Sequence, residues 1–122
     1  MAGRELGSWG EERAAQYLRR RGYKILAQNY RCRGGEIDLI ASRGRFVVFV
    51  EVKLRKSAAF AEAREFVTRA KQQRIIGTAE LWLGETACTL QPRFDVIEIY
   101  APEGEESRKI KIEHIADAFR CD

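Results

Sequence analysis

Gly35-Glu36-Ile37-Asp38-Leu39-Ile40 opens the part of the sequence that decides the fold. A second apolar stretch, Phe46-Val47-Val48-Phe49-Val50-Glu51-Val52-Lys53, follows after a short turn. Both stretches have the length and the β-branched and aromatic content of strands. The glycine in the connecting Arg43-Gly44-Arg45 predicts a hairpin between them. Acidic side chains at Asp38 and Glu51 interrupt both strands where burial would favour valine, so we expect these charges to serve a site.

The second of these strands is apolar on both faces for most of its length. One face carries Phe46, Val48, Val50 and Val52, and the other carries Val47, Phe49, Glu51 and Lys53. This pattern is typical of a central strand that is covered on both sides. In the preceding strand, over Glu36–Ser42, the same alternation predicts one face with Ile37, Leu39 and Ala41 and another with Glu36, Asp38 and Ile40.

A helix is expected before the strands, over Ser8–Arg21. Ser8 and Glu11 have the spacing of a capping box, in which two side chains and two backbone N–H groups bond reciprocally. The basic residues before Gly22 suit the negative end of a helix, and a glycine at this position commonly ends one. We therefore expect the helix to begin at Ser8 and to end at Gly22.

Apolar spacing also predicts the remaining elements. Their expected order is a first strand, the hairpin, a long helix or helix pair, two further strands and a terminal helical turn. The ranges outside the hairpin are Tyr23–Tyr30, Ala59–Leu83 with Gly84 as its end, Arg93–Tyr100, Arg108–Ile112 and Ile115–Phe119. A central strand followed by a helix and another strand makes part of the sheet parallel. The fold class is then α/β in the order αβββαβ, a mixed central sheet flanked by helices in a single domain over residues 1–122.

Positive charge is concentrated in the first part of the chain. The formal net charge is +4, yet the residues through Arg74 contain 17 Lys and Arg against 8 Asp and Glu. The residues after Arg74 contain 5 against 10. Such an asymmetry can draw a polyanion to one face of a domain. An unevenly charged surface in contact with solvent is the alternative.

Membrane and disulfide-stabilised classes of protein are not indicated. No apolar run approaches the ~18 residues that a membrane span requires, and the N-terminus lacks the apolar stretch of a secretory signal. Cys32, Cys88 and Cys121 are odd in number and widely spaced, unlike a disulfide framework or a cysteine zinc site. We expect a cytoplasmic protein with reduced thiols.

Asp38 and Glu51 lie on strands that the hairpin makes neighbours. At about 4 Å and an effective dielectric constant near 20, two like charges repel by roughly 4 kcal/mol. A divalent cation would offset this repulsion, and ligands that are carboxylate oxygens suit Mg²⁺ or Mn²⁺. Lys53, which shares a face with Glu51, could orient a water molecule or hold a phosphate oxygen. The alternative is a structural ion pair between Glu51 and Lys53.

Other charged residues are secondary candidates. Arg55, Lys71 and Arg74 could contact phosphates, or could be solvated surface charges. Glu36 shares the predicted face of Asp38 and is a candidate for supporting it. Asp95 is expected to be structural, and the single histidine, His114, is expected at the surface.

The spacing of the central acidic residues resembles a known signature. Asp38, then twelve residues, then Glu51-Val52-Lys53 is similar to the D…(D/E)xK pattern of the restriction-endonuclease-like superfamily. Several further blocks resemble the YraN-like family of bacterial proteins. These include Gly22-Tyr23, Asn29-Tyr30-Arg31, Gly35–Ile40, Val50–Lys53 with Arg55, Lys71, and Arg93-Phe94-Asp95-Val96.

The resemblance implies an endonuclease-like fold similar to that of archaeal Holliday-junction resolvases. Together with the acidic pair, it leads us to expect a Mg²⁺- or Mn²⁺-dependent nuclease acting on DNA rather than RNA, including branched DNA. The likeness to resolvases alone suggests a homodimer. Asp38, Glu51 and Lys53 would be catalytic, and Glu11 would join Asp38 and Glu51 at the metal. A non-catalytic nucleic-acid-binding protein with this fold, or a structural partner in a larger assembly, is the alternative.

Overall fold

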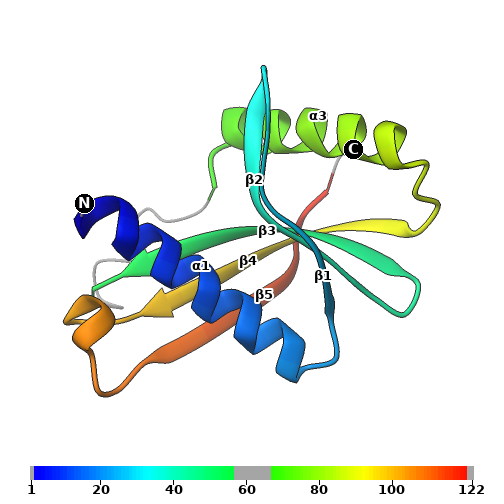
Figure 1. Cartoon of the computed structure of the whole chain (residues 1–122). Helices are drawn as coiled ribbons and strands as arrows, with labels where there is room; N and C mark the ends of the chain where they lie inside the picture. The colour runs from blue at the N-terminus through cyan, green and yellow to red at the C-terminus, as the bar shows by residue number, and fades with distance from the viewer. Residues whose placement is uncertain (1, 57–66, 121–122) are drawn as a thin grey trace.

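The computed structural model describes residues 2–56 and 67–120, with side chains from Ser8 onward (Figure 1). Within these residues, two long helices flank a single mixed sheet of five strands, so the expected α/β class is confirmed. The elements are α1 (Ala2–Arg20), β1 (Lys24–Cys32), β2 (Gly35–Arg43), β3 (Phe46–Arg55), α3 (Arg69–Thr86), β4 (Gln91–Tyr100), a short 3-10 helix (Gly104–Glu106) and β5 (Lys111–Phe119). Among the described residues, no helix is long and apolar enough to cross a membrane.

Strand β3 lies at the centre of the sheet, as its apolar faces predict. The strands are arranged in the order β1-β2-β3-β4-β5. Strands β1, β2 and β3 pair antiparallel, β3 and β4 pair parallel, and β5 pairs antiparallel with β4. The expected parallel pair is therefore confirmed between β3 and β4.

The two helices cover opposite faces of the sheet. Helix α1 buries Ala14, Ala15 and Leu18 against a face formed by Leu39, Ala41, Val48, Val50, Ile97 and Ile99. Helix α3 buries Ile75, Ile76, Ala79 and Trp82 against a face formed by Ile37, Ile40, Val47, Phe49, Phe94 and Val96. The two predicted faces of β3 are thus the faces that the helices cover.

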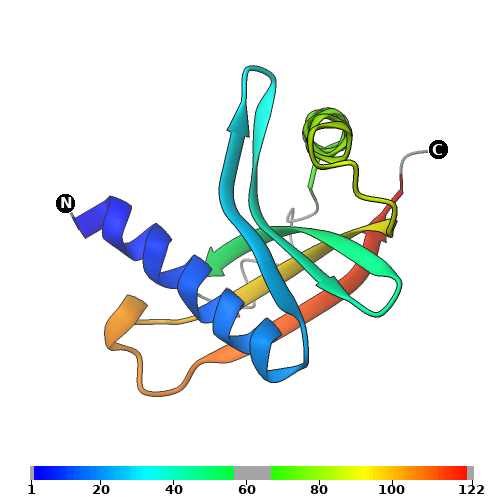
Figure 2. The ribbon, with the colours of Figure 1, turned by 45° about the vertical axis from the view of Figure 1, so that its right-hand side comes forward.

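The β1–β2 hairpin bends out of the sheet and runs beside α3 (Figures 1 and 2). The pairing of β1 with β2 shifts between Ile25 and Ala27, and bulges of this kind increase local twist. Ile37 packs in the same cluster as Ile40, whereas Leu39 packs on the other side. The strict alternation expected for β2 is therefore wrong at Ile37.

Helix α1 begins at Ala2 and not at Ser8. Because the preceding residues continue the helix, Ser8 is an interior residue and the predicted capping box is wrong. The C-terminal end follows the prediction. Gly22 has a φ of 88°, and the N–H groups of Gly22 and Tyr23 donate to the carbonyls of Arg19 and Leu18, both at 3.0 Å. This is the Schellman arrangement, in which a left-handed residue lets the chain leave the helix.

Helix α3 differs from the predicted helix at both ends. The first part of the predicted range, residues 59–66, lies outside the described part of the chain. Thr68 is extended, and its hydroxyl accepts the N–H of Lys71 at 3.2 Å, so α3 has its own N-cap and is not continuous with preceding residues. The helix also passes Gly84 and ends at Thr86, because Ala87 adopts the left-handed conformation (φ 55°) that ends it. The predicted stop at Gly84 is wrong.

The C-terminal segment is a strand and not a strand followed by a helical turn. β5 extends to Phe119, with Ile115 opposite Val96 and Phe119 opposite Phe94 of β4. The register shifts between Phe94 and Val96, and Asp117 has a φ of 56°. This irregularity interrupts the alternation from which a strand is identified, so the sequence pattern predicted helix where pairing with β4 forms a strand.

Candidate functional site

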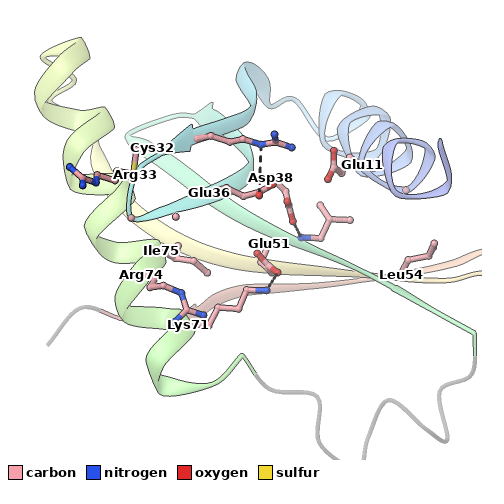
Figure 3. A pocket seen from close by; sticks show the side chains of 15 residues that line it. Glu11, Cys32, Arg33, Glu36, Asp38, Glu51, Leu54, Lys71, Arg74 and Ile75 are labelled. Carbon is pink, nitrogen blue, oxygen red and sulfur yellow. Dashed lines mark hydrogen bonds and ion pairs between the residues drawn. The ribbon is translucent and has the colours of Figure 1, made fainter. Parts of the chain in front are cut away.

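A cleft opens where strands β2 and β3 stop pairing. Their ladder ends at the pair Leu39–Val50. Beyond this pair, the Asp38 carboxylate accepts the Val52 N–H at 2.8 Å, so a side chain takes the place of the backbone partner. The cleft has a volume of about 660 Å³ and is lined by residues of α1, α3, β3 and the β1–β2 hairpin (Figure 3). The end of the ladder lets helices from opposite faces of the sheet reach one site.

Asp38 and Glu51, which the sequence predicted as partners, meet at this cleft. In Figure 3 the Asp38 side chain lies between those of Glu11 on α1 and Glu51 on β3. Burial raises the pKa of Asp38 to about 7, with further contributions from the negative charges of Glu51, Glu11 and Glu36. The hydrogen bond from the Val52 N–H opposes that increase. Asp38 therefore keeps its proton to a higher pH than an exposed aspartate does when no cation is bound.

Glu51 is almost buried, with 8% of its surface exposed, and two lysines neutralise it. The ammonium of Lys71 lies 2.7 Å from Glu51 Oε2, and the ammonium of Lys53 lies 3.8 Å from the same oxygen. Lys53 belongs to the same strand, whereas Lys71 reaches the carboxylate from α3. A cation bound by Glu51 would compete with the Lys71 ammonium for the position beside this carboxylate.

The carboxylates of Asp38 and Glu51 offer the type of ligand atom that a hard divalent cation prefers. Asp38 and Glu51 offer only oxygen atoms, and Mg²⁺ commonly binds one or two carboxylates while keeping several waters. In the part of the chain that the structure describes, no group of three or more His, Cys, Asp and Glu side chains is arranged to hold a metal ion. A cation would therefore rely on these two carboxylates and on water, and Lys71 would have to move from Glu51. Glu11 lines the cleft from α1 and adds negative charge near Asp38.

The remaining predicted residues divide into two groups. Arg74 lines the cleft from α3, and Glu36 lies on its rim with its carboxylate 3.8 Å from Arg31. Arg55 does not line the cleft, because its guanidinium lies 3.6 Å from the Glu98 carboxylate. The structure thus brings Arg74 and Glu36 to the site and places Arg55 elsewhere.

Arg31 and Arg33 of the β1–β2 hairpin also line the cleft, although neither was a site candidate from the sequence. Their position depends on a close approach of the hairpin to α3. A Cβ atom at Gly35 would lie 2.9 Å from the Thr78 hydroxyl, so only glycine fits without a shift of Thr78. Two arginines placed just before a Gly-Gly pair were the available signal for this role.

A second polar cluster lies away from the cleft, around Asp95. This fully buried carboxylate accepts hydrogen bonds from Arg93, from His114 Nε2 at 2.6 Å and from the Asp117 N–H. Burial opposes ionisation, but the hydrogen bonds from His114, Arg93 and Asp117 together lower the pKa of Asp95. His114 also contacts the Tyr17 hydroxyl at 3.2 Å and is only 12% exposed in its side chain. The expected surface position of His114 is therefore wrong. Asp95 connects β4 to β5 through its hydrogen bonds, and His114 extends this connection to Tyr17 of α1.

Comparison with known proteins identifies the family. The pattern of the family described as "Uncharacterised protein family UPF0102" matches residues 10–99. The UPF0102 protein of Caldanaerobacter subterraneus is 46% identical over 115 residues, which cover 93% of each chain. That of Syntrophomonas wolfei is 46% identical over 95% of this chain and 98% of its own. The Vibrio parahaemolyticus protein is 48% identical over 80% of this chain and 82% of its own. The resemblance to the YraN-like family is confirmed, and the chain belongs to family UPF0102.

Proposed function

We propose that this protein is a metal-dependent nuclease that hydrolyses phosphodiester bonds in DNA. The observation that carries the proposal is the Asp38–Glu51 pair at the end of the β2–β3 ladder. Burial and the neighbouring carboxylates raise the pKa of Asp38 to about 7, which is a destabilising arrangement in the absence of a cation. Perturbed carboxylates in a cleft are a common property of catalytic sites.

Asp38 and Glu51 would hold Mg²⁺ or Mn²⁺ between β2 and β3. When bound, such an ion supplies a water molecule of lowered pKa and offsets the negative charge that develops on a phosphodiester. Lys53 is not among the residues that line the cleft, but its ammonium lies 3.8 Å from Glu51, from where it would orient the attacking water or bind a phosphate oxygen. Glu11, at the α1 side of the cleft, adds negative charge beside Asp38 that would favour a bound cation.

The spacing of Asp38, Glu51 and Lys53 supports the same proposal, because it resembles the D…(D/E)xK signature of endonuclease-like proteins. The concentration of positive charge in the residues through Arg74 supports an anionic substrate. DNA, including branched DNA, is the substrate that this resemblance favours.

The test is cleavage of linear, branched and single-stranded DNA in the presence of Mg²⁺ or Mn²⁺. Asp38→Asn and Glu51→Gln keep the shape of each side chain but remove its charge, so both should abolish cleavage and leave the fold intact. Glu103→Gln, at an exposed position outside the cleft, is the matched control and should cleave as the wild type does. Cleavage that persists in both site variants would refute the assignment, as would a wild-type protein that is inert toward all three substrates.

A non-catalytic nucleic-acid-binding protein is the second candidate, and the ion pair between Lys71 and Glu51 favours it. At 2.7 Å, this pair neutralises Glu51 without a metal ion. Titration calorimetry with Mn²⁺ separates the two candidates. Binding that is lost in Asp38→Asn supports the nuclease, and the absence of binding supports the second candidate.

A further inference from the structure

The β1–β2 hairpin forms one wall of the cleft together with α3. Both views show the hairpin tip rising out of the sheet beside this helix (Figures 1 and 2). Three contacts fix it there. The Tyr30 hydroxyl donates to Glu85 at 2.6 Å, and the Cys32 thiol donates to the Thr78 hydroxyl at 3.5 Å. Gly35 approaches the same threonine so closely that a Cβ atom would clash. The hairpin is thus held in place at several points along α3.

This wall carries positive charge directly beside the acidic pair. Arg31 and Arg33 from the hairpin and Lys71 and Arg74 from α3 line the cleft, and we call these four residues the cationic wall. The Arg31 side chain is 72% exposed and lies 3.8 Å from the half-exposed Glu36, so this surface pair contributes little energy and can be exchanged for a phosphate. Figure 3 shows Arg33 and Arg74 on the side of the cleft opposite Glu11.

The types of residue that line the cleft favour duplex over single-stranded nucleic acid. None of the described residues that line it is aromatic. Proteins that bind single strands commonly stack bases on aromatic side chains, and this cleft offers no such platform among those residues. A projecting two-stranded ribbon, in contrast, has the dimensions that the major groove of B-DNA admits.

We infer that the cationic wall binds the phosphate backbone of duplex DNA, with the hairpin tip in or along a groove and the nearest phosphate held above Asp38 and Glu51. This inference rests on the proposed function and names its substrate class, double-stranded DNA recognised through its backbone and without sequence preference. Arg31, Arg33 and Arg74 carry the binding, because Lys71 is engaged with Glu51.

Binding in EDTA tests this inference without requiring catalysis. Fluorescence anisotropy would compare two duplexes of unrelated sequence with a single strand of equal length, each over a range of salt concentration. The wall variant is Arg31→Gln, Arg33→Gln and Arg74→Gln. The control variant is Arg20→Gln, Lys24→Gln and Lys109→Gln, which removes the same charge at exposed positions that do not line the cleft. Circular dichroism and urea unfolding establish that both variants fold.

The wild type is expected to bind both duplexes equally and the single strand more weakly. The wall variant should lose affinity for both duplexes. Its slope of log affinity against log salt should fall by about 0.9 for each phosphate that is no longer neutralised, or roughly 2 to 3 in total. The control variant should keep most of the slope. Equal binding of the single strand would overturn the inference, as would a wall variant that behaves as the control does or the absence of duplex binding.

The two proposals fail in different ways. If the protein cleaves DNA but the wall variant binds duplexes as the control does, the proposed nuclease activity is supported and the binding role of the cationic wall is refuted. If the wild type binds duplexes through the cationic wall but neither binds Mn²⁺ nor cleaves DNA, the binding role of the wall is supported and the proposed nuclease activity is refuted.

Discussion

Replacing Asp38 with asparagine should stabilise the metal-free protein at pH 8 and remove much of its pH dependence. Asp38 ionises with a pKa of 3.8 in the unfolded chain and of about 7 in the folded protein. The ionised Asp38 carboxylate, buried beside Glu51, therefore lowers the free energy of unfolding at pH 8. Asparagine keeps an oxygen that can accept the Val52 N–H, so the substitution removes the charge and preserves the hydrogen bond.

The sign follows from the direction of the pKa shift. Below about pH 4 the carboxyl group is protonated in both states, and it contributes no pH-dependent penalty. Between pH 4 and 7 only the folded state keeps the proton, so the free energy of unfolding falls as pH rises, and above pH 7 the full penalty applies. One pKa unit corresponds to about 1.4 kcal/mol, which makes the penalty about 4 kcal/mol at most. Partial exposure of Asp38 and screening by solvent reduce this to about 2 kcal/mol.

Urea unfolding in EDTA at several pH values between 4 and 8 measures this effect. We expect the free energies of unfolding of the wild type and of Asp38→Asn to be similar near pH 4. They should then diverge, with the variant about 2 kcal/mol more stable at pH 8. Glu103→Gln, at an exposed site, should follow the wild type. Parallel profiles for the wild type and Asp38→Asn, or a variant that is less stable at pH 8, would refute the reasoning.

Three further predictions concern the same region of the molecule. Mg²⁺ or Mn²⁺ should raise the calorimetric unfolding temperature of the wild type at pH 8 but not that of Asp38→Asn, and an equal increase in both would contradict a site at this carboxylate. Lys71→Met should tighten the binding of Mn²⁺ in titration calorimetry, because the ammonium 2.7 Å from Glu51 no longer competes with the ion, whereas weaker binding would indicate that Lys71 supports the site. Gly35→Ala should lower the free energy of unfolding by about 1 to 3 kcal/mol, because the new methyl group overlaps the Thr78 hydroxyl. A second substitution, Thr78→Ala, should recover part of that loss in urea unfolding, and the absence of any loss in Gly35→Ala would show that the hairpin adjusts.

The central part of the fold could be predicted because its signals are local. Alternating apolar residues on both sides of β3 identify a strand that is covered on both faces, and Gly44 identifies the hairpin that joins it to β2. Gly22 likewise marks the end of α1 by its own conformational freedom. In each case the deciding signal lies within a few residues, so the pattern in the sequence is sufficient.

Predictions failed where a neighbouring element changes the local pattern. β5 has a weak alternation and is a strand because β4 offers an edge for pairing. Ile37 turns to the α3 side because the β1–β2 hairpin twists as it leaves the sheet. His114 is enclosed because Tyr17 and Asp95, from distant parts of the chain, meet it.

By itself, the sequence determined the central strand, the mixed α/β class and the candidates Asp38, Glu51 and Lys53, because periodicity and misplaced charge are visible in a single stretch. Only the tertiary structure decided that the β2–β3 ladder ends beside Asp38 and that Lys71 neutralises Glu51. It alone also placed Arg31 and Arg33 in the cleft wall. The physical reason is that the pKa of a carboxylate depends on burial and on charges nearby in space, and these are set by how the helices and the hairpin pack.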